Sequence, residues 1–207
     1  MPHGQKETVG NFQKMIRELK KVNLTSSYTH QFGVVMYEEV LKYRPKTIHD
    51  IGVLNGFSTA YLTMAAKEIG ANVVAIDLFE LYEYNSVSQE QFEDNMDALG
   101  LMDTITVQKM SVYDWLDLNV SIEFVHLDIA NTGKTLMEFF NRVTGNPVVL
   151  FEGGWDRRDN QDWMLKYNKK KIIPTLNEND ISFELLYNEV VEVGDKIQYP
   201  SLSKVVL

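Results

Sequence analysis

A turn with two glycines follows the first predicted strand and carries the clearest chemistry in the chain. The turn runs from His49 to Thr59 and contains Asp50, Gly52, Asn55, Gly56 and Ser58. Gly52 lets the chain turn sharply, Gly56 lets a ligand approach the backbone, and the helix that begins there presents unpaired N–H groups and a positive dipole end. A small anionic or carboxylate-bearing ligand suits such a place.

The spacing of these glycines excludes two common nucleotide sites. The dinucleotide pattern G-x-G-x-x-G requires glycine where the chain has Leu54. A phosphate-binding P-loop requires Gly-Lys-Ser/Thr, whereas Gly56 is followed by Phe57 and Ser58. A plainer alternative is that the two glycines only make a tight turn between strand and helix.

A second acidic residue stands at the end of the next predicted strand. Asp77 lies 25 residues beyond Gly52, about the spacing at which an acidic side chain accepts both ribose hydroxyls of a bound nucleoside. In open α/β sheets, ligands bind outside the carboxyl ends of the strands, where the strand order reverses. The turn and Asp77 together therefore predict a nucleoside-containing ligand at this edge.

The elements that must position these residues alternate between strands and helices. Short apolar runs predict strands over Thr47–Ile51, Asn72–Ile76, Ile105–Gln108, Glu123–Leu127 and Pro147–Phe151. Helical spacing predicts helices over Ser58–Ile69, Ser88–Leu99 and Thr135–Val143, the second with a Ser88/Gln91 capping box. Repeated strand–helix–strand units with right-handed crossovers predict a doubly wound α/β fold, a mainly parallel sheet with helices on both faces.

Both ends of the chain depart from this alternation. Val9–Val22 and Gln31–Tyr43 predict helices that cap the strand ends. Phe183–Val190 and Ser203–Leu207 predict two strands with no helix between them, hence an antiparallel hairpin at one sheet edge. We expect a single domain over 1–207, with a helical cap over 1–44, a ligand-binding core over 45–154, and a rim segment and hairpin over 155–207.

Composition narrows the possible partners. The chain has no cysteine, which excludes disulfides and thiolate metal sites and fits a reducing compartment. The first 25 residues hold no apolar run of signal-peptide length, and no window approaches the length of a membrane span. We therefore expect a cytoplasmic protein without a membrane partner. Glu68–Gln108 holds nine acidic and no basic residues, which argues against nucleic acid. Arg157–Lys171 holds six basic and two acidic residues, and either steers an anion or forms a solvated helix face.

The Asp50–Ser58 turn followed by Val73–Asp77 resembles the first two cofactor motifs of the class I S-adenosylmethionine-dependent methyltransferases. Phe124–Asp128 and Val148–Gly154 make the chain most similar to the small-molecule O-methyltransferases of the macrocin and sugar type. The resemblance extends from about Ser27 to Gly154. It implies a seven-stranded sheet whose last strands form an antiparallel hairpin, in agreement with the pattern of the tail.

The resemblance also implies S-adenosylmethionine as the cofactor and S-adenosylhomocysteine as its product. Asp50 and Gly52 would lie against the methionine part, and the turn residues Asn55, Gly56 and Ser58 would line its pocket. Asp77 would hold the ribose, and Leu78 would flank the adenine. Met110 and Ser111 occupy the place of a further adenine contact, although Met110 is equally suited to core packing.

Methyl transfer to a hydroxyl requires an aligned acceptor and a group that removes a proton. Asp128, after the fourth predicted strand, is the best candidate base and is expected near the cofactor methyl. His30 is a second candidate, with a surface or helix-capping role as its alternative. Asp128 and Glu152, helped by Asn131 or Asp156, could form a Mg²⁺ site, or could remain isolated carboxylates.

The segment after the fifth predicted strand holds four residues that suit a ring-shaped or anionic acceptor: Trp155, Arg157, Arg158 and Trp163. The alternative is that the tryptophans only pack beneath a lid. We therefore expect an O-methyltransferase that acts on a small-molecule acceptor, a sugar or a secondary metabolite. The incomplete acidic run after Asp128 leaves a second hypothesis: a protein of the same fold that binds the cofactor without transfer. The N-terminal helices could form a homodimer.

Overall fold

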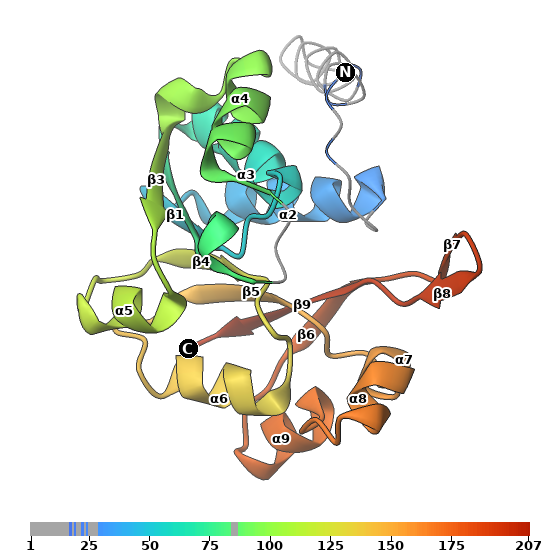
Figure 1. Cartoon of the computed structure of the whole chain (residues 1–207). Coiled ribbons are helices and arrows are strands. Elements are labelled where there is room, and N and C mark those ends of the chain that lie inside the picture. Colours follow the sequence, from blue (N-terminus) through green and yellow to red (C-terminus); the bar gives the residue numbers. More distant parts are fainter. Residues whose placement is uncertain (1–16, 18, 20–21, 23, 25–28, 84–86) are drawn as a thin grey trace, which may run out of the picture.

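A seven-stranded sheet forms the centre of the computed structural model, which describes residues 17, 19, 22, 24, 29–83 and 87–207 (Figure 1). The strand order is β3-β2-β1-β4-β5-β9-β6. The first five strands pair in parallel, and β9 pairs antiparallel with β5 and β6. The strands are β1 Thr47–Ile51, β2 Asn72–Asp77, β3 Ile105–Lys109, β4 Phe124–Leu127, β5 Val148–Glu152, β6 Glu184–Asn188 and β9 Ser201–Val206.

This topology confirms the predicted doubly wound fold and the antiparallel pair at its edge. The five parallel strands begin and end within one residue of the predicted bounds, because parallel strands buried on both faces appear in the sequence as continuous apolar runs. β4 and β5 are buried at every residue. The strand order reverses between β1 and β4, so a ligand crevice is expected at the carboxyl ends of these two strands.

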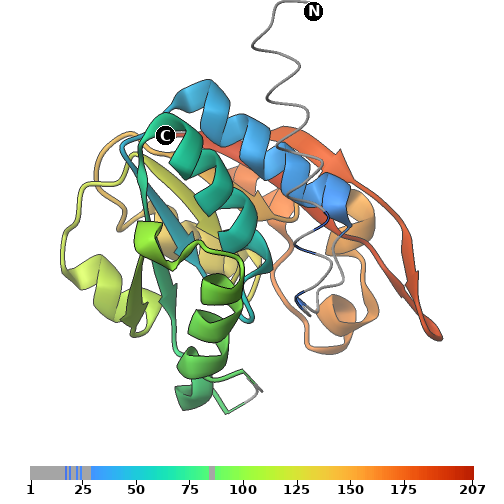
Figure 2. The same cartoon turned by 90° about the horizontal axis from the view of Figure 1, so that it is seen from above.

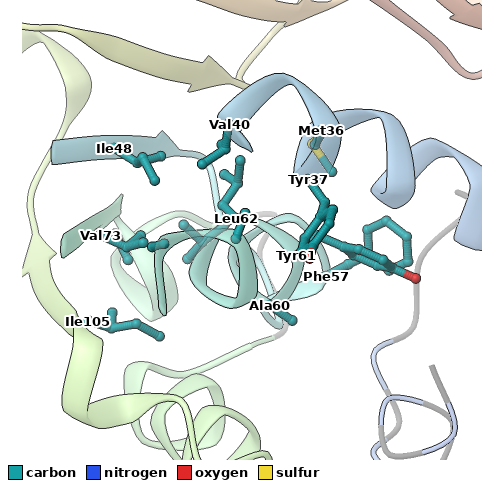
Figure 3. Close-up of a cluster of buried hydrophobic side chains, with 14 of the residues drawn as sticks. Met36, Tyr37, Val40, Ile48, Phe57, Ala60, Tyr61, Leu62, Val73 and Ile105 are labelled. Carbon is teal, nitrogen blue, oxygen red and sulfur yellow. The ribbon is translucent and has the colours of Figure 1, made fainter. Parts of the chain in front are cut away.

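Helices cover both faces of the sheet (Figure 1). One face carries α2 His30–Tyr43, α3 Phe57–Ile69 and α4 Gln89–Ala98; the other carries α5 Val112–Asp117, α6 Gly133–Phe140 and α9 Ile172–Glu178. Figure 2 shows α2 and α3 side by side on this face, and Figure 3 shows Leu62 of α3 close to Ile48 and Val40. The predicted cap of α4 is present, since the Ser88 hydroxyl accepts a hydrogen bond from the Gln91 N–H at 3.1 Å.

Several short elements were not predicted. They are the 3₁₀ turns Phe79–Leu81 and Met102–Thr104, α5, α7 Asp156–Asp159, α8 Asp162–Lys166 and α9, of three to seven residues each. Such lengths are too short for an apolar period to be visible. The helix predicted from Thr135 begins at Gly133, because the Thr132 hydroxyl caps it by accepting from the Thr135 N–H.

The tail contains a hairpin that was missed. Between β6 and β9 the chain forms β7 Val191–Val193 and β8 Lys196–Gln198, joined at Gly194 and Asp195. Figure 2 shows this hairpin projecting beyond the sheet. The helix predicted over Val9–Val22 lies almost entirely outside the described residues, and with it one of the two N-terminal helices proposed to form a dimer. No helix within the described ranges is long and apolar enough to cross a membrane.

Candidate functional site

The turn after β1 is held in a conformation that only glycine adopts easily. Gly52 has φ +84°, and a Cβ there would lie 1.9 Å from the carbonyl oxygen of Asp128. The Asp128 N–H donates to the Ile51 carbonyl at 2.8 Å, so the ends of β1 and β4 are in direct contact. The sequence prediction of a sharp turn at Gly52 is therefore confirmed, with close approach to the β4 backbone as its physical reason.

Asp77 at the end of β2 anchors the same turn. One of its carboxylate oxygens accepts from the N–H groups of Val53 at 2.8 Å and Leu54 at 3.1 Å. The other accepts from the Phe79 N–H at 2.7 Å. Leu54 has φ +49°, an unfavourable conformation for leucine, which these bonds help to hold. The residue expected to hold a ribose thus also shapes the loop beside it.

A cavity of about 470 Å³ opens beside this turn, and we name it the switch-point cavity. Six of the predicted cofactor residues line it: Gly52, Asp77, Leu78, Met110, Ser111 and Asp128. Its wall is mostly apolar, with Ile51, Ile76 and Ile129 among the contributors. The volume and lining are typical of a small-molecule site, which is apolar with a few placed polar groups.

Sequence reasoning missed other residues of the switch-point cavity, namely Leu54, Tyr82, Val112, Tyr113, Ala130 and Thr135. The Tyr113 hydroxyl donates to Glu138 at 2.8 Å, and this hydrogen bond raises the pKa of Tyr113. That phenol therefore stays protonated near neutral pH and is not available to remove a proton from an acceptor hydroxyl. No sequence motif marks these positions, because they follow different strands and meet only in the folded chain.

Four other predicted cofactor residues lie behind the turn and do not line the cavity. Asp50 is fully buried, and accepts from the hydroxyls of Ser58 at 2.9 Å and Thr59 at 2.6 Å. Its other oxygen lies 2.8 Å from Nδ1 of the buried His126. This network joins β1, β4 and the start of α3.

Gly56 and Asn55 face α4 and not the cavity. Gly56 has φ +98°, and a Cβ there would lie 2.4 Å from Cε of Met96. The Asn55 carbonyl accepts from the Asn95 side chain at 3.0 Å. Gly56 therefore allows helix packing, where the sequence reasoning had assigned it to the approach of a ligand.

His30 lies at the start of α2 and is paired with α3. Its Nδ1 is 2.6 Å from the Tyr61 hydroxyl. Burial raises the pKa of Tyr61, so this phenol remains protonated and can donate to the imidazole. His30 is not among the residues lining the switch-point cavity.

Asp128 and Glu152 end neighbouring strands but line different cavities. Asp128 accepts from the Asn131 side chain at 2.8 Å and borders the switch-point cavity. Glu152 is 1% exposed and borders a second cavity of about 860 Å³. Within the ranges that the structure describes, no three His, Asp or Glu side chains gather closely enough to hold a metal ion.

The second cavity, which we name the hairpin cavity, lies between the end of β5, the α7–α8 segment and the β7–β8 hairpin. Of the predicted acceptor residues, Arg158 and Trp163 line it. Trp155 packs edge-on against Tyr199 at 5.8 Å between ring centroids, and the exposed Arg157 lies 5.6 Å from the Trp155 ring. Trp155 thus joins α7 to the base of the hairpin.

No protein-family model and no curated protein matches the chain. Solved structures match it in fold. A putative O-methyltransferase from Klebsiella pneumoniae is 10% identical with a TM-score of 0.60, over 94% of this chain and 89% of that one. The O-methyltransferase from Bacillus cereus, solved with S-adenosylhomocysteine, is 15% identical with a TM-score of 0.60, over 93% and 89%.

A third match is the O-methyltransferase TomG from Streptomyces achromogenes, involved in tomaymycin synthesis and solved with S-adenosylmethionine. It is 13% identical with a TM-score of 0.58, over 94% of this chain and 88% of that one. The chain has the Rossmann-like fold of the methyltransferases. At these identities the likeness concerns the fold, and it confirms the resemblance deduced from the Asp50–Ser58 turn and Asp77 at that level.

Proposed function

We propose that the chain is an S-adenosylmethionine-dependent methyltransferase that methylates a hydroxyl of a small molecule, a sugar or a secondary metabolite. One observation carries the proposal: the switch-point cavity lies where the strand order reverses, with the Gly52 turn and Asp77 on its wall. Ligands of doubly wound proteins bind at this point of the sheet. Two of the proteins that share the fold are solved with S-adenosylmethionine or S-adenosylhomocysteine.

The residues of the switch-point cavity fit such a cofactor in chemistry. Leu78 and Met110 offer apolar cover for an adenine ring, and the half-buried Asp77 offers a charged acceptor for a ribose hydroxyl. When bound, S-adenosylmethionine would supply an electrophilic methyl group and leave as S-adenosylhomocysteine. Asp50 and Ser58 would not touch the cofactor; their hydrogen bonds would fix the start of α3 against β1 and β4.

Asp128 is our candidate for the base. Asn131 donates to one of its oxygens and orients the carboxylate, which is half-buried at the end of β4. The other carboxylate oxygen would accept the proton of the acceptor's hydroxyl group while the hydroxyl oxygen forms its bond to the methyl carbon. His30 is the second candidate base; the alternative is that it serves only as the hydrogen-bond partner of Tyr61.

A binding protein without transfer activity is the second candidate. It is favoured by the lack, in the described part of the chain, of any group of three acidic or histidine side chains around Asp128 that could hold a metal ion. The two candidates separate in one experiment. The protein is titrated calorimetrically with S-adenosylhomocysteine and then assayed for methyl transfer from labelled S-adenosylmethionine to a panel of hydroxylated compounds. Binding with transfer supports the enzyme, binding without transfer supports the second candidate, and no binding refutes both.

A further inference from the structure

The switch-point cavity and the hairpin cavity open at neighbouring strand ends. Leu127 of β4 is paired with Phe151 of β5, so the next residues, Asp128 and Glu152, follow side by side. Paired strands are about 4.8 Å apart. Asp128 borders the first cavity and Glu152 the second. A molecule in the hairpin cavity would therefore lie next to the candidate base.

The two cavities differ in chemistry. The hairpin cavity is polar, and only Ile197 and Pro200 contribute purely apolar side chains to its wall. Trp163 and Tyr199 provide ring faces that also carry a polar group, and Gln161 and Gln198 provide amides that both donate and accept. Such a wall suits a ring compound with several hydroxyl or amino groups, and suits a flat apolar compound poorly.

Hydrogen bonds hold part of this wall in place. The Gln161 side-chain oxygen accepts from Nη1 of Arg158 at 2.5 Å and from Nε1 of Trp163 at 2.8 Å. The Arg158 guanidinium also lies 5.6 Å from the Trp163 ring. The buried Asp159 accepts from the N–H groups of Ile172 and Ile173 and so ties α7 to α9. The amide and the indole are thus fixed before any ligand binds.

The charges of the wall disfavour an anionic ligand. Three carboxylates, Glu152, Asp162 and Asp195, stand against the two cations Arg158 and Lys196, a net charge of −1. Glu152 is buried, where repulsion of an anion is weakly screened. Arg158 already donates to Gln161. This opposes the sequence-based expectation of an anionic acceptor.

We propose that the hairpin cavity is the acceptor site, that the β7–β8 hairpin is its specificity wall, and that it takes a hydroxyl- or amino-bearing ring compound without an anionic group. This inference rests on the proposed methyltransferase function, because it assigns the second substrate of that reaction. The hairpin was not visible as a functional element in the sequence, and it contributes a third of the cavity's lining residues: Asp195, Lys196, Ile197 and Gln198.

The test uses three probes that share one ring and differ in charge: methyl α-glucoside, glucosamine and glucose 6-phosphate. Each is titrated into the ¹⁵N-labelled full chain at millimolar concentrations while the indole N–H signals of Trp163 and the buried Trp115 are followed. We expect the neutral and amino probes to shift the Trp163 signal saturably, the phosphate to leave it in place, and Trp115 to be unaffected.

Variants give the matched controls. Tyr199→Ala and Gln198→Ala should weaken the binding about fivefold or more, whereas Val193→Ala, on the same hairpin but not lining the cavity, should not. Gln198→Ala keeps the test valid if loss of the Trp155–Tyr199 contact disturbs the hairpin. The proposal is overturned if no probe moves Trp163, if glucose 6-phosphate binds as well as the others, or if Val193→Ala is as damaging as Gln198→Ala.

Titration of the same proteins with S-adenosylhomocysteine separates this inference from the proposed function. The hairpin variants should bind it as tightly as the wild type does. If the wild type fails to bind it, the methyltransferase proposal fails, whatever the Trp163 signals show. If it binds but the sugars do not, only the assignment of the acceptor site fails.

Discussion

Replacing Asp77 by asparagine is the sharpest perturbation of the switch-point cavity. A carboxylate offers about four acceptor positions, and the N–H groups of Val53, Leu54 and Phe79 occupy three of them. About one position therefore remains for a ribose hydroxyl, fewer than the two bonds implied by the family resemblance. A hydrogen bond to a charged acceptor contributes ~1.5–3 kcal/mol, so Asp77→Asn should raise the Kd of S-adenosylhomocysteine about 10- to 150-fold.

Calorimetric titration measures this change, and thermal unfolding accompanies it. The amide nitrogen of asparagine would face a backbone N–H of the turn, so the free energy of unfolding should also fall by about 1–3 kcal/mol. Asp97→Asn is the matched control, since Asp97 is exposed on α4 and does not line the cavity; neither quantity should change. If folded Asp77→Asn bound the ligand as tightly as the wild type, the assignment of Asp77 to the ribose would be refuted.

Four further predictions concern neighbouring residues. Gly52→Ala should lower the unfolding free energy by at least about 3 kcal/mol in denaturant titrations, whereas Gly100→Ala, with φ +67° but open space around it, should cost only about 1–2 kcal/mol. Asp128→Asn should lower kcat for methyl transfer about 100-fold or more; an unchanged kcat would exclude it as the base. Burial lowers the pKa of His49 to about 4, so the unfolded chain takes up a proton that folded His49 does not, and stability should fall by ~3 kcal/mol from about pH 6.5 to about pH 4; His49→Leu should remove that part of the pH dependence. EDTA should change the transfer rate less than about twofold, because no third carboxylate or histidine among the described residues joins Asp128; abolished transfer, restored by Mg²⁺, would contradict this.

The parallel core was predictable because its pattern is local. Buried strands such as β4 and β5 are continuous apolar runs, and the cap at Ser88 has its own residue signature. The β7–β8 hairpin also had a signal, the Gly194–Asp195 pair between two short alternating runs, but the prediction joined only the outer strands. The short helices α7, α8 and α9 offered too few turns for a period to appear.

Part of the cavity wall was predictable from the sequence, because its residues stand at the ends of predicted strands. Gly52, Asp77 and Asp128 lie at strand ends, and the sheet topology alone brings such ends together. Asp50 and Gly56 show where a prediction from a sequence motif fails. A motif cannot tell whether a side chain faces the ligand or the interior, and here Asp50 bonds His126 while Gly56 makes room for Met96. Tyr113 and Thr135 reach the cavity only through tertiary packing.

A crystal structure of the protein grown with S-adenosylhomocysteine tests the central claim most directly. We predict density for an adenosyl group between Leu78 and Met110, with a ribose hydroxyl within hydrogen-bonding distance of the Asp77 carboxylate and the sulfur on the side of Asp128. An empty switch-point cavity at saturating ligand, or the ligand bound only elsewhere on the molecule, would contradict the account.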